Sequence, residues 1–293
     1  MRILSFPSRS LLAALASLYA LSAAALQWPV ADGSPALTFG SFRSGRFLPS
    51  ITVGPAGAVI RAAAEGDVVF RFDGDMLPSG LPSTLGSFVA LSHAGGLVSV
   101  YSRLEPGSLP AGILPVPSGK VLGGAGGSGF YSMKESGFTL YDLVKRRYLN
   151  PLVLLSPARD DRAPVVRGFY LSSGGRNFPL PGTRSFRQGA YEFLADIWDP
   201  PPAADARPRA PYEIRLAIDG QEVVRFIYDT AHAESGRLTF FEPLRVDSRT
   251  RFFPDGTLRL GSFMLSRGRS AITLTVSDYA GNERVVTATV LVE

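Results

Sequence analysis

The chain has 293 residues, of which 45% are hydrophobic and 19% are charged, so it is long enough for about two globular domains with ordinary cores. It contains no cysteine, which excludes a disulfide scaffold, a thiolate metal site and a thiol nucleophile. The formal net charge is +5, but the basic residues are spread along the chain and interleaved with acids, so we expect no nucleic-acid partner.

Residues 1–25 form a segment that is first basic and then apolar. Arg2 and Arg9 precede a stretch rich in leucine and alanine, which ends in three alanines at 23–25. This arrangement predicts a secretory signal peptide with cleavage after Ala25. We therefore expect an exported protein of the periplasm or the cell surface, without stable membrane insertion after signal cleavage.

Residues 26–157 consist of short apolar or alternating runs separated by Gly, Pro and Ser, a pattern typical of an antiparallel β domain. Gly95 and Gly96 predict a hairpin turn between two of these runs. The strands expected in this domain are 58–63, 67–72, 87–92, 97–103 and 137–144.

A polar segment flanked by proline predicts a domain linker at 158–164. Residues 165–293 then show about seven short runs with turn signals, which favours an immunoglobulin-like β-sandwich. Asp219 and Gly220 predict a tight hairpin turn, and the proline-rich segment 200–211 predicts an exposed loop. The strands expected here are 165–171, 190–198, 212–218, 222–228, 257–264, 270–277 and 285–292. The predicted fold class is therefore all-β, with two antiparallel domains.

Five motifs of the first domain follow one another in an informative order. They are Trp28-Pro29-Val30 with Phe39-Gly40 and Arg43, GAVIRAAAEGDVVF at 57–70, FVALSHAGGLVSVYSRL at 88–104, VPSGKVLGGAGGSG at 116–129, and GFTLYDLV with YLNPLVLL within 137–155. Together they resemble the lysostaphin-type (LytM-like) zinc metallopeptidases, which cut peptide cross-bridges in peptidoglycan. The resemblance covers roughly residues 28 to 155 and implies a peptidase-like β domain at 26–157.

In active members, the resemblance implies a zinc ion held by His-x-x-x-Asp and by the second histidine of His-x-His, with two further histidines that assist catalysis. The corresponding positions in this chain are Leu48, Thr52, Arg103, Thr139 and Tyr141. A catalytic zinc needs about three protein ligands, and a guanidinium coordinates no metal. We therefore predict a degenerate cleft at these five residues, with no catalytic residue, no metal and no cofactor, in a pseudoenzyme.

The two histidines of the chain cannot rebuild such a site. His93 falls at a framework position of the resemblance, and His232 is expected to be an exposed loop residue. Asp73 and Asp75 lack the remaining ligands of a calcium loop, and the glycines of 123–129 lack the Lys-Ser/Thr ending of a phosphate-binding loop.

Two further features of the sequence have alternative interpretations. Arg103 either binds a carboxylate or glycan anion in the former cleft, or is a structural residue that pairs with Asp142 or lies at the cleft rim. Four phenylalanines of the second domain form either a ligand surface or core: Phe240, Phe241, Phe252 and Phe253. The motif VSDYAGNE at 276–283 resembles the turn before the last strand of many bacterial immunoglobulin-like modules.

The sequence alone is compatible with three functions. The first is a non-catalytic envelope protein that binds peptidoglycan or regulates a cell-wall hydrolase through the zinc-less domain. The second is a structural or adhesive surface protein that uses the immunoglobulin-like domain. The third is a hydrolase with an atypical metal site.

Overall fold

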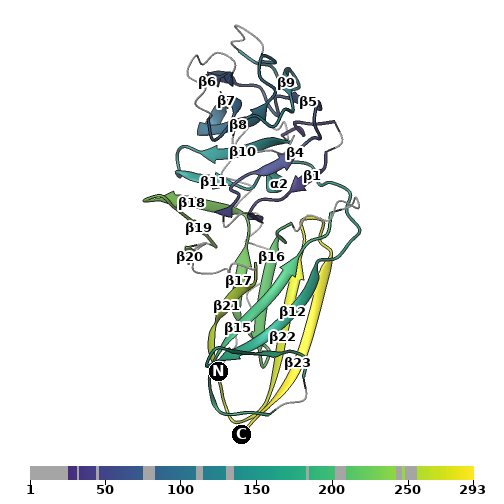
Figure 1. The fold of residues 1–293 in the computed structure, drawn as a ribbon, viewed down its shortest axis with the longest axis vertical. Helices are drawn as coiled ribbons and strands as arrows, with labels where there is room; N and C mark the ends of the chain where they lie inside the picture. The colour runs from purple at the N-terminus through teal and green to yellow at the C-terminus, as the bar shows by residue number, and fades with distance from the viewer. Residues whose placement is uncertain are drawn as a thin grey trace, which may run out of the picture.

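The computed structural model describes residues 26–31, 33–43, 46–74, 83–109, 115–129, 135–182, 185–201, 209–241, 246–247 and 256–293. The predicted signal peptide lies outside these residues. Within them, the chain is almost entirely β, which confirms the predicted fold class (Figure 1). No helix among the described residues has the length and apolar character needed to cross a membrane.

A sheet of ten strands makes up most of the upper part of Figure 1. Its strands are β1 (Pro35–Leu37), β4 (Ile51–Val53), β6 (Asp67–Phe72), β7 (Ser87–Ser92), β8 (Leu97–Leu104), β10 (Ser136–Asp142), β11 (Arg147–Leu149), β18 (Thr230–Glu234), β19 (Arg237–Phe240) and β20 (Val246–Asp247). The main order is β20-β19-β18-β11-β10-β8-β7-β6, while β4 also pairs with β10 and β1 pairs with β4. We call it the first sheet.

Two short strand pairs and a helix complete this half. The pairs are β2 (Phe42–Arg43) with β3 (Arg46–Phe47), and β5 (Val59–Arg61) with β9 (Val121–Gly124). Helix α2 (Pro151–Leu154) begins after Asn150, whose side-chain oxygen accepts a hydrogen bond from the N–H of Leu152 at 3.0 Å. An asparagine cap followed by proline is a favourable helix start, because proline lacks the N–H that would need a partner there.

Two further sheets lie in the lower part of Figure 1. One has the order β13-β12-β15-β21, with β12 (Val165–Ser173), β13 (Arg176–Pro179), β15 (Gly189–Trp198) and β21 (Leu258–Leu265). The other has the order β14-β23-β22-β16-β17, with β14 (Ser185–Phe186), β16 (Glu213–Ile218), β17 (Gln221–Ile227), β22 (Gly268–Ser277) and β23 (Glu283–Val292). The ring of Phe186 contacts Phe178 and Tyr191 of the other sheet, so the two sheets share a core. The immunoglobulin-like type and the domain limits at 26–157, 158–164 and 165–293 stay predictions.

Strands β18, β19 and β20 were not expected from the sequence. β17 belongs to a lower sheet, and the chain continues from it into β18, which pairs with β11 of the first sheet. Phe240 of β19 contacts the rings of Phe39 and Phe47, and Phe240 and Phe241 are 2% and 3% exposed. These two phenylalanines therefore belong to the core, whereas positions 252 and 253 lie outside the described residues.

The two predicted hairpin turns are present. Gly95 and Gly96 have φ values of 74° and 79° between β7 and β8, and Asp219 and Gly220 have 52° and 79° between β16 and β17. At Asp219 and Gly220, positive φ at both central residues of a two-residue turn matches the right-handed twist of the hairpin. The connection between β7 and β8 is longer and includes a 3-10 turn at Ala94–Gly96.

Candidate functional site

One face of the first sheet is accessible to solvent. Directly opposed residues of antiparallel strands share a face, and the register gives two such rows across the sheet: Phe70, Ala90, Val100 and Thr139 in one, and Ser92, Val98, Tyr141 and Tyr148 in the other. Phe70 is 54% exposed, and Thr139 and Tyr141 are half-buried. Ala90, the smallest of the eight, is buried between its neighbours at 7% exposure. We call these eight residues the open face.

The opposite face of the same strands is core. Leu91, Tyr101, Phe138 and Leu140 are fully buried. The hydroxyl of Tyr101 accepts a hydrogen bond from the N–H of Ala63 at 2.7 Å, and burial raises the pKa of this phenol to about 12.

Four of the five predicted cleft residues align along β10, on the same side as the open face. Gly137, Thr139 and Tyr141 alternate along this strand, and Thr52 of β4 is opposite Gly137. The guanidinium of Arg103 lies over Gly137, since a Cβ atom at that glycine would be 3.0 Å from Nη2 of Arg103. The structure therefore brings these four residues together, although Thr52 and Arg103 come from β4 and β8.

Arg103 is a buried residue of the framework. Its Nε donates to the carbonyl of Glu135 at 2.9 Å, and its own carbonyl accepts from the N–H groups of Gly126 and Gly127, each at 3.0 Å. The residue is 7% exposed, with φ at 56°. Asp142 lies at the other end of β10, roughly 16 Å away along the strand. These contacts favour a structural role over anion binding.

Leu48 belongs to none of the strands, and its backbone is hydrogen-bonded to the segment that precedes β2. It lies between β3 and β4, where its N–H donates to the carbonyl of Ser41 at 3.1 Å and its carbonyl accepts from the N–H of Gly40 at 2.8 Å. Neither of these two hydrogen bonds involves another predicted cleft residue.

The two histidines have different surroundings. His93 is 7% exposed, and its ring nitrogens lie 2.7 Å from the carbonyl of Glu65 and 2.7 Å from the hydroxyl of Ser99. Both nitrogens are engaged, which supports its framework role. His232 lies in strand β18 and is 5% exposed, so the expectation of an exposed loop residue was wrong.

A pocket of about 580 Å³ lies at the β11 side of the open face. Its lining includes Tyr141, Lys145, Arg146, His232 and Glu234. The ring of Tyr141 meets that of Tyr148 edge to face at 5.1 Å. Burial, and to a smaller degree the neighbouring Tyr141, raise the pKa of Tyr148. β18 supplies His232, Ala233 and Glu234 to this lining, so sequence analysis of the first domain could not predict it.

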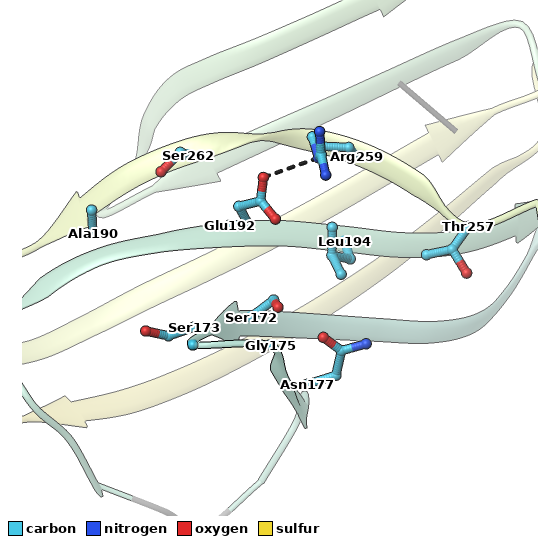
Figure 2. A pocket seen from close by; sticks show the side chains of 11 residues that line it. Ser172, Ser173, Gly175, Asn177, Ala190, Glu192, Leu194, Thr257, Arg259 and Ser262 are labelled. Carbon is cyan, nitrogen blue, oxygen red and sulfur yellow. Dashed lines mark ion pairs between the residues drawn. The ribbon is translucent and has the colours of Figure 1, made fainter. Parts of the chain in front are cut away.

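A second groove, of about 520 Å³, lies on the sheet that contains β12 and β15 (Figure 2). Glu192 of β15 and Arg259 of β21 form an ion pair across it at 3.0 Å. Ser172, Ser262 and Asn177 also line it with polar groups (Figure 2). This groove is shallow and polar, and no motif in the sequence indicated it.

Three aspartates from separate segments meet between the halves of the molecule: Asp160 after α2, Asp199 at the end of β15, and Asp278 after β22. Oxygens of all three lie within 4.8 Å of one another. Nη2 of Arg209 lies 2.8 Å from Oδ2 of Asp160 and 2.8 Å from Oδ2 of Asp199. We call these four residues the acidic junction.

The acidic junction is deeply buried. Asp199, Asp278 and Arg209 are 2%, 3% and 4% exposed. Burial raises the pKa of Asp199 to about 7; the charge of Arg209 lowers it, and those of Asp278 and Asp160 raise it. Only the turn containing Asp278 had a recognisable motif, so sequence analysis missed the cluster.

Comparisons with known proteins give partial matches. A protein-family model, which describes no function, matches residues 163–293. No curated protein matches the chain. Among solved structures, the chain is similar to Csd3 from Helicobacter pylori, with 22% identity and a TM-score of 0.34 over 46% of this chain and 34% of that chain. The match thus spans about one third of Csd3.

Two further similar structures are an M23 catalytic domain and a peptidase by name. The catalytic domain of the prophage-encoded M23 protein EnpA from Enterococcus faecalis, solved as a variant, is 22% identical with a TM-score of 0.33, over 40% of this chain and 88% of that chain. The antimicrobial peptidase lysostaphin from Staphylococcus simulans is 11% identical with a TM-score of 0.33, over 88% of this chain and 87% of that chain. At these identities and TM-scores, the likeness assigns no activity to this chain.

Proposed function

We propose that this chain is an exported, non-catalytic protein of the cell envelope that binds peptidoglycan through the open face of the first sheet. The observation that carries the proposal is the chemistry of that face. Phe70, Thr139 and Tyr141 offer aromatic rings and hydroxyl groups to solvent. Aromatic rings provide apolar area for sugar rings, and hydroxyls provide hydrogen bonds for glycan and peptide groups.

The histidines support the non-catalytic part of the proposal. The full chain has two histidines and no cysteine. Both ring nitrogens of His93 lie within hydrogen-bond distance of framework groups, so that residue is occupied. A single remaining imidazole does not supply the two histidine ligands that the zinc site of this resemblance requires.

Binding is tested by co-sedimentation of the full chain with purified sacculi. We expect Phe70→Ala combined with Tyr141→Ala to weaken retention at least fivefold. The matched control is Tyr170→Ala, because Tyr170 is also a half-buried tyrosine on a strand but belongs to β12. Equal retention of the double variant and the wild type, or no retention of either, would refute binding through the open face.

Catalysis is tested separately with dye-labelled sacculi and added zinc. We expect no release of label by the full chain. Zinc-dependent release would overturn the non-catalytic proposal and leave the binding result unaffected.

Two related functions give different results in the same assays. A regulator of a cell-wall hydrolase changes label release when it is mixed with that enzyme, although it releases none alone. A surface adhesin is favoured by the polar groove at Glu192 and Arg259. In that case, the double variant Glu192→Ala and Arg259→Ala abolishes attachment of the protein to its target surface. The open-face variants leave this attachment unchanged.

A further inference from the structure

We propose that the acidic junction binds one divalent cation, of the Ca²⁺ class, between the first sheet and the two lower sheets. The proposal is independent of peptidoglycan binding. It concerns Asp160, Asp199 and Asp278, to which the sequence analysis gave no function.

The geometry of the oxygens fits one ion. The three carboxylates offer atoms that lie within 4.8 Å of one another. Ligands placed 2.3–2.6 Å from a shared Ca²⁺ are at most about 5 Å apart, so a single ion reaches all three. All of these donors are oxygens, which suits a hard cation, and Ca²⁺ tolerates irregular oxygen geometry better than Mg²⁺ does.

The balance of charge also calls for a cation. Three carboxylates and the single guanidinium of Arg209 leave a formal charge of −2 in a buried place. Buried charges that lack partners are costly, and they are commonly paired or bound to metal ions. One divalent cation brings the cluster to neutrality.

An individual oxygen atom points to the same conclusion. Oδ1 of Asp199 is buried and has no hydrogen-bond partner, although the residue is only 2% exposed. Oδ2 of the same carboxylate is already 2.8 Å from Arg209. Buried carboxylate oxygens are normally satisfied, so an orphaned one beside two other carboxylates indicates that a positive partner binds there.

The remaining oxygens are held in place by local hydrogen bonds. Oδ1 of Asp278 accepts from the N–H groups of Ala280 and Asn282, each at 2.8 Å, and its Oδ2 accepts from the side-chain amide of Asn282 at 2.8 Å. Oδ1 of Asp160 accepts from the N–H of Arg162 at 3.1 Å. These contacts fix the two carboxylates and leave lone pairs for an ion.

There is also space beside the carboxylates. A cavity of about 40 Å³ is lined by all three aspartates and by Trp28, Thr38 and Tyr279. Trp28 and Thr38 come from the N-terminal half, whereas Asp199 and Asp278 come from the lower sheets. A cation held here joins three segments that are far apart in the sequence, and so stabilises the junction.

The aromatic rings at the cavity provide a direct assay. Tb³⁺ replaces Ca²⁺ at oxygen sites and emits when nearby tryptophan or tyrosine is excited. We expect the full chain to sensitise one equivalent of Tb³⁺ through Trp28 and Tyr279, and Ca²⁺ to compete for it. Asp199→Asn and Asp278→Asn should each weaken binding at least tenfold. Asp161→Asn is the matched control, since Asp161 is an exposed neighbour of Asp160.

Thermal unfolding gives a second readout that does not depend on luminescence. Ca²⁺ should raise the Tm of the wild type by several degrees relative to EDTA. Asp199→Asn removes a buried charge, so its Tm in EDTA should be higher than that of the wild type, while Ca²⁺ should no longer raise it. The proposal is wrong if Ca²⁺ leaves the wild-type Tm unchanged, or if Asp199→Asn binds Tb³⁺ like the wild type. Arg209 would then be the cation that offsets the charge of the three carboxylates.

Discussion

Gly40 illustrates how one residue determines the packing between the two halves. Its φ is +80°, and a Cβ atom there would overlap the ring of Tyr228, which is 1% exposed. Tyr228 comes from the connection between β17 and β18, so Gly40 allows a chain segment from the lower sheets to pack against the first.

Replacing Gly40 tests this contact. We expect Gly40→Ala to lower the free energy of unfolding by about 2–4 kcal/mol, because it combines overpacking with an unfavourable left-handed conformation. Gly57→Ala is the control: Gly57 has φ at +77°, but a Cβ atom there would meet no other atom within 4 Å, so the cost is about 1 kcal/mol. Urea denaturation of both variants measures the difference. Equal losses would mean that Tyr228 moves aside freely.

Single residues also show which parts of the site the sequence could predict. The motif order named Thr52, Arg103 and Thr139 as neighbours, and the structure places them on the adjacent strands β4, β8 and β10. It could not predict that Arg103 is buried, since burial depends on Gly137 and on the carbonyl of Glu135. The acidic junction escaped prediction for a similar reason: its carboxylates are brought together only by tertiary structure.

At the scale of elements, long alternating strands were predictable and short ones were not. β6 and β7 match the predicted ranges, since their apolar and turn residues define both ends. β1, β4 and β11 have three residues each, too few to show a period. β18 and β19 lie in the part of the sequence assigned to the second domain. The pairing of β18 with β11 is a long-range contact that local patterns do not encode.

Phe240 packs the β18–β19 hairpin against aromatic rings of the N-terminal half, in addition to the pairing of β18 with β11. Its ring centroid lies 5.6 Å from that of Phe39 and 5.3 Å from that of Phe47. We expect Phe240→Ala to lower the free energy of unfolding by about 3–5 kcal/mol, the usual cost of deleting a buried ring. Met264→Ala, at a residue that is 63% exposed, should cost less than about 0.5 kcal/mol. A loss below about 1 kcal/mol in Phe240→Ala would show that the hairpin contributes little to the core.

At the scale of the whole molecule, many contacts cross the predicted division at 158–164. Thr38 donates to the carbonyl of Ala210 at 2.9 Å, and the N–H of Ala210 donates to Ser41 at 3.1 Å. Because these hydrogen bonds join the two halves, we expect the halves to unfold together, although the sequence pattern predicts two domains.

Asn150 bonds to residues of both halves, so its replacement tests whether the halves unfold together. It is 1% exposed, its amide donates to the carbonyl of Tyr228 and to the hydroxyl of Tyr279, and its oxygen caps α2. Loss of three hydrogen bonds costs about 2–4 kcal/mol, so Asn150→Ala should destabilise the molecule by that amount. Since the lost hydrogen bonds join both halves, the loss of stability should be seen in the unfolding of both halves.

The two tryptophans make this measurable, because Trp28 lies in the N-terminal half and Trp198 at the end of β15. Trp28→Phe and Trp198→Phe each leave a single fluorescent reporter, in opposite halves. We expect the two reporters to give one common unfolding midpoint, and Asn150→Ala to shift both midpoints by the same amount. Coincident transitions from separate probes are the standard test of two-state unfolding. A shift at one reporter alone would show that the halves unfold independently, and that the junction joins them without coupling their stability.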